Sequence, residues 1–132
     1  MPVVDASVMF EFLALGDHEE AARERLLGER QALWAPELLD AEVGHALRRA
    51  VLRRQADADL AVRALWELEK LPVHRISHQG LVHYAWALRD RVSFYDGLYV
   101  ALAQLLDQPL LTFDKRLAKA GLDAEVEVLT QA

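Results

Sequence analysis

Residues 92–114 constrain the fold most strongly, because they combine an amphipathic helix with a short, unbroken apolar run. Apolar residues recur every three or four positions and predict one buried face of a helix beginning near Asp96: Leu98, Ala101, Leu102, Leu105 and Leu106. Gln108-Pro109 cannot extend this helix. The run at 110–113 is typical of a strand that is covered on both faces, and Asp114 follows it directly. We therefore expect a helix, then a buried strand, then an acidic residue at the end of that strand.

The rest of the chain repeats this alternation of short apolar runs and helical patterns. Strands are predicted at residues 3–4, 32–35, 71–76, 110–113 and 125–129. Helices are predicted after Ser7 and at residues 19–27, 37–54, 57–70, 77–90, 96–106 and 115–120, with Ser7, Asp57 and Ser77 as N-caps and Pro36 opening the third helix. Pro72 makes the third strand short or near an edge. This order predicts an α/β fold in which a parallel sheet lies between helices.

Composition and length limit the possible classes of protein. The 132 residues suffice for one domain, and 53% of them are hydrophobic, which supports a substantial core. No apolar run approaches the roughly 18 residues of a membrane span, and Asp5 interrupts what could have been a leader sequence. The absence of cysteine fits a reducing cytosol. The net charge of −6 means that any binding to a polyanion would need a local basic patch or bound cations.

Acidic residues stand where the predicted strands and helices meet. Asp5 follows the first strand and Asp114 follows the fourth, at the strand ends where open α/β sheets bind their ligands. Glu42 lies beside the buried face of the helix at 37–54, and His45, Arg49 and Arg53 share its edge. A mixture of acids and bases along one border of a crevice suits a site that handles phosphate groups.

The contexts of these acids resemble the PIN-domain ribonucleases, and among them the VapC-type toxins of VapBC toxin–antitoxin pairs. The likeness covers nearly the whole chain and rests on four motifs, which are VVDASV with Asp5, PELLDAEVGHALRR with Glu42, SFYDGLYVALA with Asp96 and LLTFDKRLA with Asp114. It implies one three-layer α/β/α PIN-like domain over residues 1–132, with a central parallel sheet of about five short strands. The four acids would be catalytic and metal-binding, with Ser7 and Thr112 as polar supports. Gly97 stands where this family often has alanine.

The resemblance further implies a function, a cofactor and partners. The expected activity is that of a cytoplasmic, Mg²⁺- or Mn²⁺-dependent endoribonuclease toxin that cleaves single-stranded regions of RNA. Hard divalent cations take oxygen ligands from a few carboxylates and from substrate phosphate, so the donor set is suitable. Asp5, Asp96 and Asp114 would be the principal ligands, with Glu42 acting through water or orienting the nucleophile. A cognate VapB-type antitoxin, a homodimer and no membrane association are also implied.

Several alternatives remain at this stage. Asp96 or Asp114 alone could simply cap a helix, and Arg49 and Arg116 could contact RNA or only face solvent. The tryptophans are expected mainly in the core. Haloacid-dehalogenase phosphatases need an aspartate where this chain has Ser7, and the pattern of response-regulator receivers is also incomplete. The main alternative is a non-catalytic PIN-like module that binds RNA or protein, whose acids hold only a structural cation.

Overall fold

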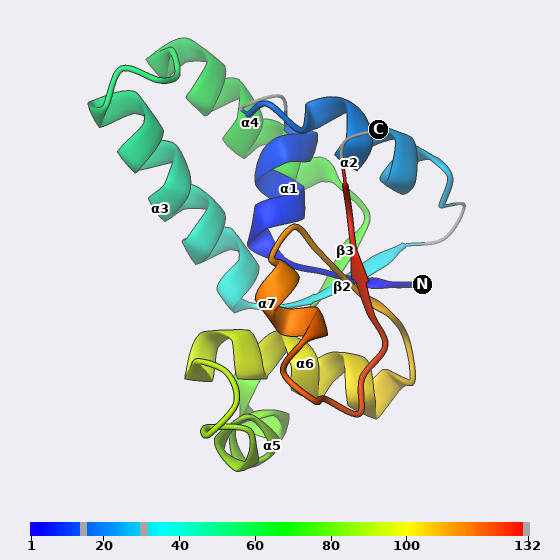
Figure 1. Cartoon of the computed structure of the whole chain (residues 1–132). Helices are drawn as coiled ribbons and strands as arrows, with labels where there is room; N and C mark the ends of the chain where they lie inside the picture. Colours follow the sequence, from blue (N-terminus) through cyan, green and yellow to red (C-terminus); the bar gives the residue numbers. More distant parts are fainter. Residues whose placement is uncertain (14–15, 30–31, 131–132) are drawn as a thin grey trace.

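A single parallel sheet forms the centre of the protein. The computed structural model describes residues 1–13, 16–29 and 32–130. The strands are β1 (Val3–Val4), β2 (Leu33–Pro36), β3 (Val73–Ile76), β4 (Leu110–Thr112) and β5 (Val126–Val128), in the spatial order β3-β2-β1-β4-β5. All neighbouring strands pair in parallel (Figure 1). The predicted parallel α/β sheet is therefore confirmed, and β3 lies at an edge as Pro72 suggested.

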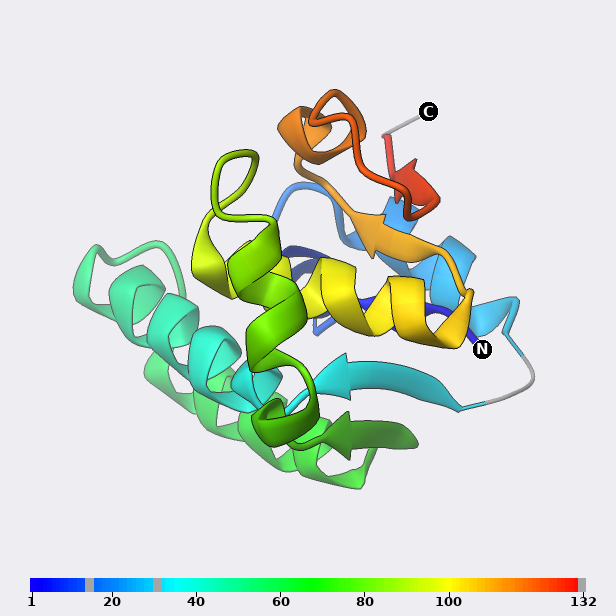
Figure 2. The same ribbon diagram turned by 90° about the horizontal axis from the view of Figure 1, so that it is seen from below.

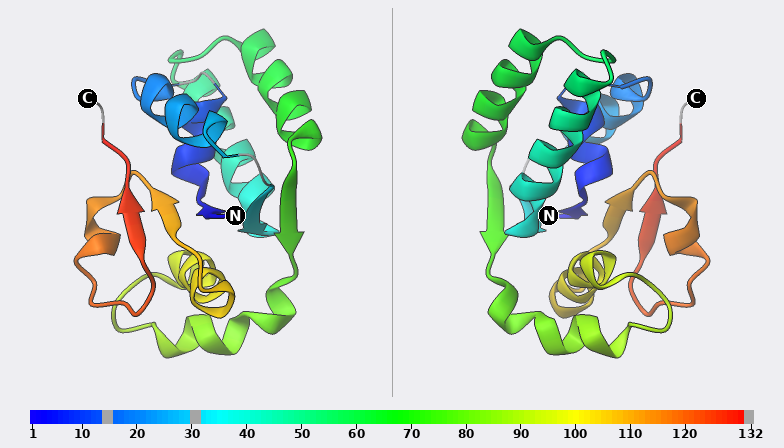
Figure 3. Two further views of the ribbon diagram at one scale, coloured as in Figure 1. Left: turned by 90° about the vertical axis from the view of Figure 1, so that its right-hand side faces the viewer. Right: turned by 90° about the vertical axis from the view of Figure 1, so that its left-hand side faces the viewer.

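Helices cover both faces of this sheet. They are α1 (Ala6–Phe12), α2 (Glu19–Leu27), α3 (Leu38–Leu52), α4 (Ala58–Lys70), the short 3₁₀ helix η1 (His78–Gly80), α5 (Val82–Ala87), α6 (Phe94–Leu106) and α7 (Lys115–Ala118). Figures 2 and 3 show α1 to α4 on one face of the sheet and α5 and α6 on the other, with α7 beside the β5 edge. This is the expected three-layer arrangement. None of the helices in the described part of the chain is both long and apolar enough to cross a membrane.

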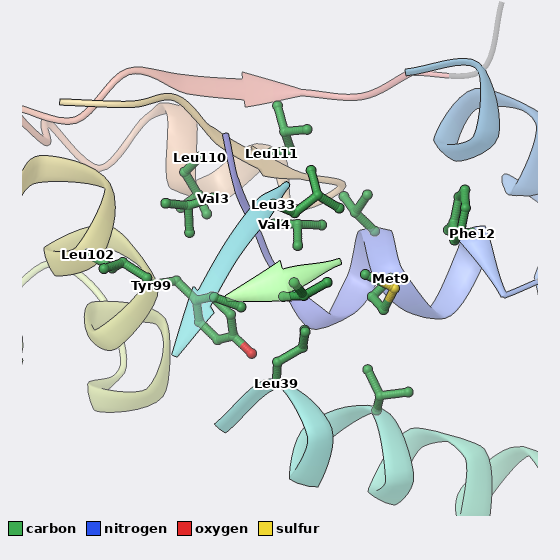
Figure 4. Close-up of a cluster of buried hydrophobic side chains, with 14 of the residues drawn as sticks. Val3, Val4, Met9, Phe12, Leu33, Leu39, Tyr99, Leu102, Leu110 and Leu111 are labelled. Carbon is green, nitrogen blue, oxygen red and sulfur yellow. The ribbon is translucent and has the colours of Figure 1, made fainter. Parts of the chain in front are cut away.

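The core is densest around the two central strands. Val3 and Val4 of β1 pair with Leu110 and Leu111 of β4, and all four side chains are fully buried. Figure 4 shows these residues together with Leu39 of α3 and other apolar side chains from both helical layers. Since both faces of β1 and β4 are covered, their side chains are apolar except for Thr112 at the carboxyl end of β4, without polar alternation.

The junction between β2 and α3 differs from the sequence prediction. Pro36 was expected to open a helix, but it is the last residue of β2 and lies opposite Ile76 of β3. Proline can occupy this position because the amide of Glu37, the next residue, donates to the carbonyl of Ile76. The helix therefore begins at Leu38, and the Leu38 amide donates to Nε2 of His78 at 2.9 Å.

Several predicted caps and one predicted helix also need correction. Asp5 caps α1 in place of Ser7, because its carboxylate accepts a hydrogen bond from the Val8 amide. Ser77 caps only the turn η1, and α5 ends at Ala87, so the single helix expected at 77–90 is wrong. Asp57 does cap α4, as predicted.

The tryptophan prediction is also wrong in part. Trp66 and Trp86 each have 60% of their surface exposed, whereas Trp34 packs against the core.

Candidate active site

The four acids that the sequence singled out lie around the point where the strand order reverses. The chain moves from β1 outward to β2 and β3, then returns to β4 on the other side of β1. Ligands of open α/β sheets bind in the crevice at this kind of position, beyond the carboxyl ends of the strands. Asp5 directly follows β1, and Asp114 comes two residues after the end of β4. Because β1 and β4 are parallel neighbours, both carboxylates lie beyond the carboxyl ends of the strands, on the same side of the sheet.

Asp5 is the most buried of these acids, with 9% of its surface exposed. Its Oδ1 accepts hydrogen bonds from the Ser7 hydroxyl at 2.6 Å and from the Val8 amide at 3.1 Å. Burial nevertheless raises the pKa of Asp5 to about 6, opposed by these bonds and by one from Thr112, with a smaller increase from the charge of Asp96. A buried carboxyl with a raised pKa beside another acid is typical of functional sites.

Asp96 lies in the first turn of α6, as expected, but it does not cap the helix. Ser93 is the cap, and its hydroxyl accepts a hydrogen bond from the Asp96 amide. The Asp96 carboxylate is therefore not needed to begin the helix. Its pKa is raised mainly by burial and also by the charge of Asp114, whereas Ser93 lowers it. Since α6 packs on β1, β2 and β4, its first turn is held against the central strands.

Glu42 approaches the same region from α3, on the opposite helical layer. It is half-buried beside the buried residues Leu39 and Val43, as the helical pattern predicted. Burial raises the pKa of Glu42, the hydroxyl of Tyr99 lowers it, and the charge of Asp96 raises it. The helices α6 and α3, on opposite faces of the sheet, therefore each bring one acid to the carboxyl ends of the central strands.

Asp114 caps α7 and is paired with a cation of its own chain. Its carboxylate accepts a hydrogen bond from the Arg116 amide and forms an ion pair with the Arg116 guanidinium at 2.8 Å. The Arg116 hydrogen bond holds the pKa of Asp114 below its usual value. Arg116 itself is largely exposed, so this ion pair lies at the surface.

Ser7 and Thr112 connect the ends of β1 and β4. The Ser7 hydroxyl donates to Asp5 and accepts a hydrogen bond from the Phe113 amide at 3.1 Å. Thr112 is fully buried, interacts with Asp5, and accepts a hydrogen bond from the Asp114 amide at 3.0 Å. These contacts join Asp5 and Asp114 through short polar links, which is the kind of support that the sequence suggested for Ser7 and Thr112.

Asp96 connects the four acids electrostatically. Its charge raises the pKa of Asp5 and of Glu42, and Asp114 in turn raises the pKa of Asp96. The fold thus brings all four near one another although they are far apart in sequence. Among residues 1–13, 16–29 and 32–130, however, no three acidic, histidine or cysteine side chains already converge as metal ligands. A cation would have to draw these carboxylates closer together.

A groove of about 740 Å³ runs beside this site between α1 and α3. Glu42 and Ser7 lie on its wall, and Arg49 and Arg53 continue along the α3 side. Three aromatic residues also line it, namely Phe10, Tyr95 and Phe113. The groove therefore combines cations and aromatic rings next to the acids, whereas Arg116 lies outside it.

Sequence reasoning did not single out Tyr95, Tyr99 or Phe113 as parts of this region. Tyr95 and Phe113 each immediately precede one of the acids, and Tyr99 lies one helical turn after Asp96. Side chains three residues apart share one side of a helix, so this spacing was the available signal for Tyr99. Nothing in the local pattern distinguishes Tyr99 from an ordinary core residue.

Sequence comparisons with known proteins agree on one family. Residues 3–122 match the PIN domain family. Ribonuclease VapC1 of Mycobacterium tuberculosis is 49% identical over 129 residues, which cover 96% of each chain. Ribonuclease VapC3 of the same species is 42% identical over 119 residues, covering 89% of this chain and 85% of the relative.

Solved structures share the fold at lower sequence identity. Mycobacterium tuberculosis VapC20, described as a sarcin-ricin loop cleaving toxin, superposes with a TM-score of 0.74 at 20% identity and covers 98% of this chain and 100% of its own. A toxin–antitoxin complex from Klebsiella pneumoniae superposes with a TM-score of 0.73 at 19% identity over the full length of both chains. The three-layer architecture is therefore one that these toxins share.

Proposed function

Because the chain belongs to the PIN-domain family and, within it, to the VapC ribonucleases, we propose that it is a metal-dependent endoribonuclease and the toxin of a type II toxin–antitoxin pair. The observation that carries this proposal is the gathering of Asp5, Glu42, Asp96 and Asp114 around Asp96 at the strand-order reversal. Its substrate would be single-stranded regions of RNA in the cytoplasm.

The chemistry of the donor set fits a hard divalent cation such as Mg²⁺ or Mn²⁺. The four acids offer only carboxylate oxygens, which these ions prefer. Unscreened by a cation, two carboxylates about 4 Å apart would repel by roughly 4 kcal/mol at an effective dielectric near 20. Burial, with a smaller contribution from neighbouring acids, raises the pKa values of Asp5, Glu42 and Asp96, as expected for carboxylates gathered in a partly buried site.

The four acids divide into two proposed roles. Asp5, Asp96 and Asp114 would bind the cation, and Glu42 would orient the attacking water or contact the cation through water. When bound, the cation would make that water more acidic and offset the charge that develops on the phosphoryl oxygens. Ser7 and Thr112 would fix the orientation of Asp5 and the position of the β4 end through the hydrogen bonds described above.

The groove between α1 and α3 is the proposed path of the RNA. Arg49 and Arg53 could contact phosphates, since cations along a groove follow a polyanionic backbone. Phe10, Tyr95 and Phe113 could stack on unpaired bases, which contact aromatic rings irrespective of sequence. Arg116 lies outside the groove and could contact a phosphate once it is released from Asp114.

A cognate VapB-type antitoxin is the proposed protein partner, and a homodimer the proposed assembly. One of the solved structures with this fold is a toxin–antitoxin complex, and another is VapBC2 of Rickettsia felis bound to a promoter DNA fragment. An antitoxin arginine that reached the carboxylates would supply the positive charge that they lack, in the way that Arg116 does for Asp114.

The competing hypothesis is a non-catalytic PIN-like module that binds RNA or protein and whose acids hold only a structural cation. Cleavage of single-stranded and structured RNA by the partner-free protein, with Mg²⁺ or with EDTA, distinguishes the two. We expect RNA cleavage with Mg²⁺ and none with EDTA. In Asp5→Asn and Asp96→Asn the cleavage rate should fall at least about a hundredfold while the proteins still fold. Asp57→Asn, at an exposed helix cap far from the acids, is the control. Unchanged cleavage in both site variants would overturn the assignment.

A further inference from the structure

We propose that the hydroxyl of Tyr99 is a positioning group for Glu42, to which it donates a hydrogen bond when the acids bind a cation. The inference rests on the proposed function of the acids and goes beyond it, because it assigns a role to a residue of the core. Tyr99 would not touch the substrate or the cation; it would hold the Glu42 carboxylate in place.

The first observation is a polar atom buried without a partner. Only 2% of the Tyr99 surface is exposed, and its hydroxyl forms no hydrogen bond of normal geometry with any described residue. Such a group costs roughly 1–3 kcal/mol relative to a satisfied one. Phenylalanine would fill the same space without this cost, so a buried tyrosine indicates a partner in another state of the protein.

The direction of the side chain identifies that partner. Tyr99 lies three residues after Asp96 on α6, and its ring enters the core with the hydroxyl on the side that faces Leu39 (Figure 4). Leu39 lies in the first turn of α3, and Glu42 follows it by three residues on the same side of that helix. The hydroxyl therefore points from one helical layer toward the part of the other that carries Glu42.

The electrostatics of the two groups agree with this geometry. The Tyr99 hydroxyl is close enough to lower the pKa of Glu42. Burial, the charge of Glu42, the direct interaction with its carboxylate and the charges of Asp5 and Asp96 raise the pKa of Tyr99 well above its usual value. The phenol therefore keeps its proton and can act only as a donor toward a carboxylate. The two groups therefore interact although they form no hydrogen bond of normal geometry, and in the proposed cation-bound state this bond is completed.

Glu42 lacks the hydrogen bonds that hold the carboxylates of Asp5 and Asp114. Asp5 is held by Ser7 and Val8, and Asp114 by Arg116, but no described residue forms a hydrogen bond of normal geometry to the Glu42 carboxylate. One oxygen of Glu42 could accept from Tyr99 while the other stays free for a water or a cation. Hydrogen bonds that orient ligands typically change metal affinity by 10- to 100-fold.

The test is the substitution Tyr99→Phe, with Mn²⁺ binding as the readout. We expect Tyr99→Phe to bind Mn²⁺ about tenfold more weakly, measured from the electron paramagnetic resonance of free Mn²⁺. In EDTA, its urea unfolding midpoint should be the same as that of the unchanged protein or higher. In a Glu42→Ala background the same substitution should have no further effect, because its partner is gone. Tyr84→Phe removes an exposed hydroxyl on α5 and should leave binding unchanged.

The outcomes separate this inference from the proposed function. Wild-type Mn²⁺ binding by Tyr99→Phe overturns the Tyr99 role, as does an equal loss in the Glu42→Ala background. A Tyr99→Phe protein that does not fold also overturns it, since the removed hydroxyl has no structural partner. If instead Asp5→Asn and Asp96→Asn leave Mn²⁺ binding intact, or the unchanged protein binds no Mn²⁺, the metal site itself is wrong and Tyr99 has nothing to position.

Discussion

Arg116 holds Asp114 in a two-pronged ion pair, with its Nη2 2.8 Å from Oδ2 and its Nε 3.1 Å from Oδ1 of the carboxylate. The two residues are only two positions apart, and the Arg116 side chain is 88% exposed. One of the four proposed metal-site acids is thus already neutralised by a neighbouring cation. A metal ion that binds Asp114 must compete with this guanidinium.

Arg116→Ala should therefore strengthen metal binding. Because this ion pair is exposed to solvent, we expect Mn²⁺ affinity to rise only a few-fold at low salt, with a smaller gain at high salt. Isothermal titration calorimetry would measure it. Lys115→Ala removes the same charge next to Asp114 without breaking this ion pair and serves as the control. Equal affinities in all three proteins would show that the pair does not compete with the cation.

Asp5→Asn should stabilise the metal-free protein while it abolishes cleavage. Folding raises the pKa of the Asp5 carboxyl from 3.8 to about 6, mainly through burial, so the folded state binds more protons than the unfolded state in that pH window. Stability conferred by Asp5 is then present at low pH and is lost as pH rises through about 6, at a cost of up to about 3 kcal/mol at pH 7. Asparagine keeps the helix cap and carries no charge.

The stabilisation by Asp5→Asn should consequently depend on pH. Urea unfolding in EDTA should show it almost fully at pH 7 and only in small part at about pH 4, where Asp5 is protonated in the folded state and partly protonated in the unfolded state. Asp57→Asn, at the exposed cap of α4, gives the comparison. A gain of the same size at both pH values would mean that burial of the charge is not its cause.

His78→Ala should destabilise the fold by about 1 kcal/mol, the usual value of a lost helix cap. The Nε2 atom of His78 accepts the hydrogen bond of the Leu38 amide, and Glu37 at the cap position makes no side-chain bond of its own. Chemical denaturation measures the change. His83→Ala, at an exposed position on α5, should have almost no effect, and similar losses in both variants would contradict the capping role.

Substitution by alanine should change the free energy of unfolding differently at Gly97 and at Gly44. A Cβ atom on Gly97 would lie 3.1 Å from the Ala85 carbonyl oxygen and 3.3 Å from its Cα and Cβ, whereas one on Gly44 would meet nothing within 4 Å. Gly97 thus permits the close packing of α5 on α6. Gly44→Ala should gain about 0.5–1 kcal/mol of unfolding free energy from helix propensity, and Gly97→Ala should gain none. Thermal or urea unfolding of the two variants decides this.

Local patterns were enough to predict the strand–helix order, the parallel sheet and the positions of the acids in it. A buried strand is uniformly apolar, and a helix repeats its buried face every three to four residues, so Val3–Val4 and residues 94–106 were recognisable in the sequence. Junctions were harder to predict because their hydrogen bonds depend on distant partners. Pro36 ends a strand because β3 lies beside it, and Ser77 begins only a short turn.

Local sequence was enough to establish most of the elements, the positions of Asp5, Asp96 and Asp114 at strand ends and a helix start, and that of Glu42 beside the buried face of α3, because these features depend on residues close together in the chain. Contacts between distant residues depend on the folded arrangement: His78 with the Leu38 amide across 40 positions, the Tyr99 hydroxyl with the surroundings of Glu42, and aromatic rings with arginines in one groove. The physical reason is that hydrogen bonds and charge interactions act over a few ångströms in space, and separation along the sequence does not report that distance.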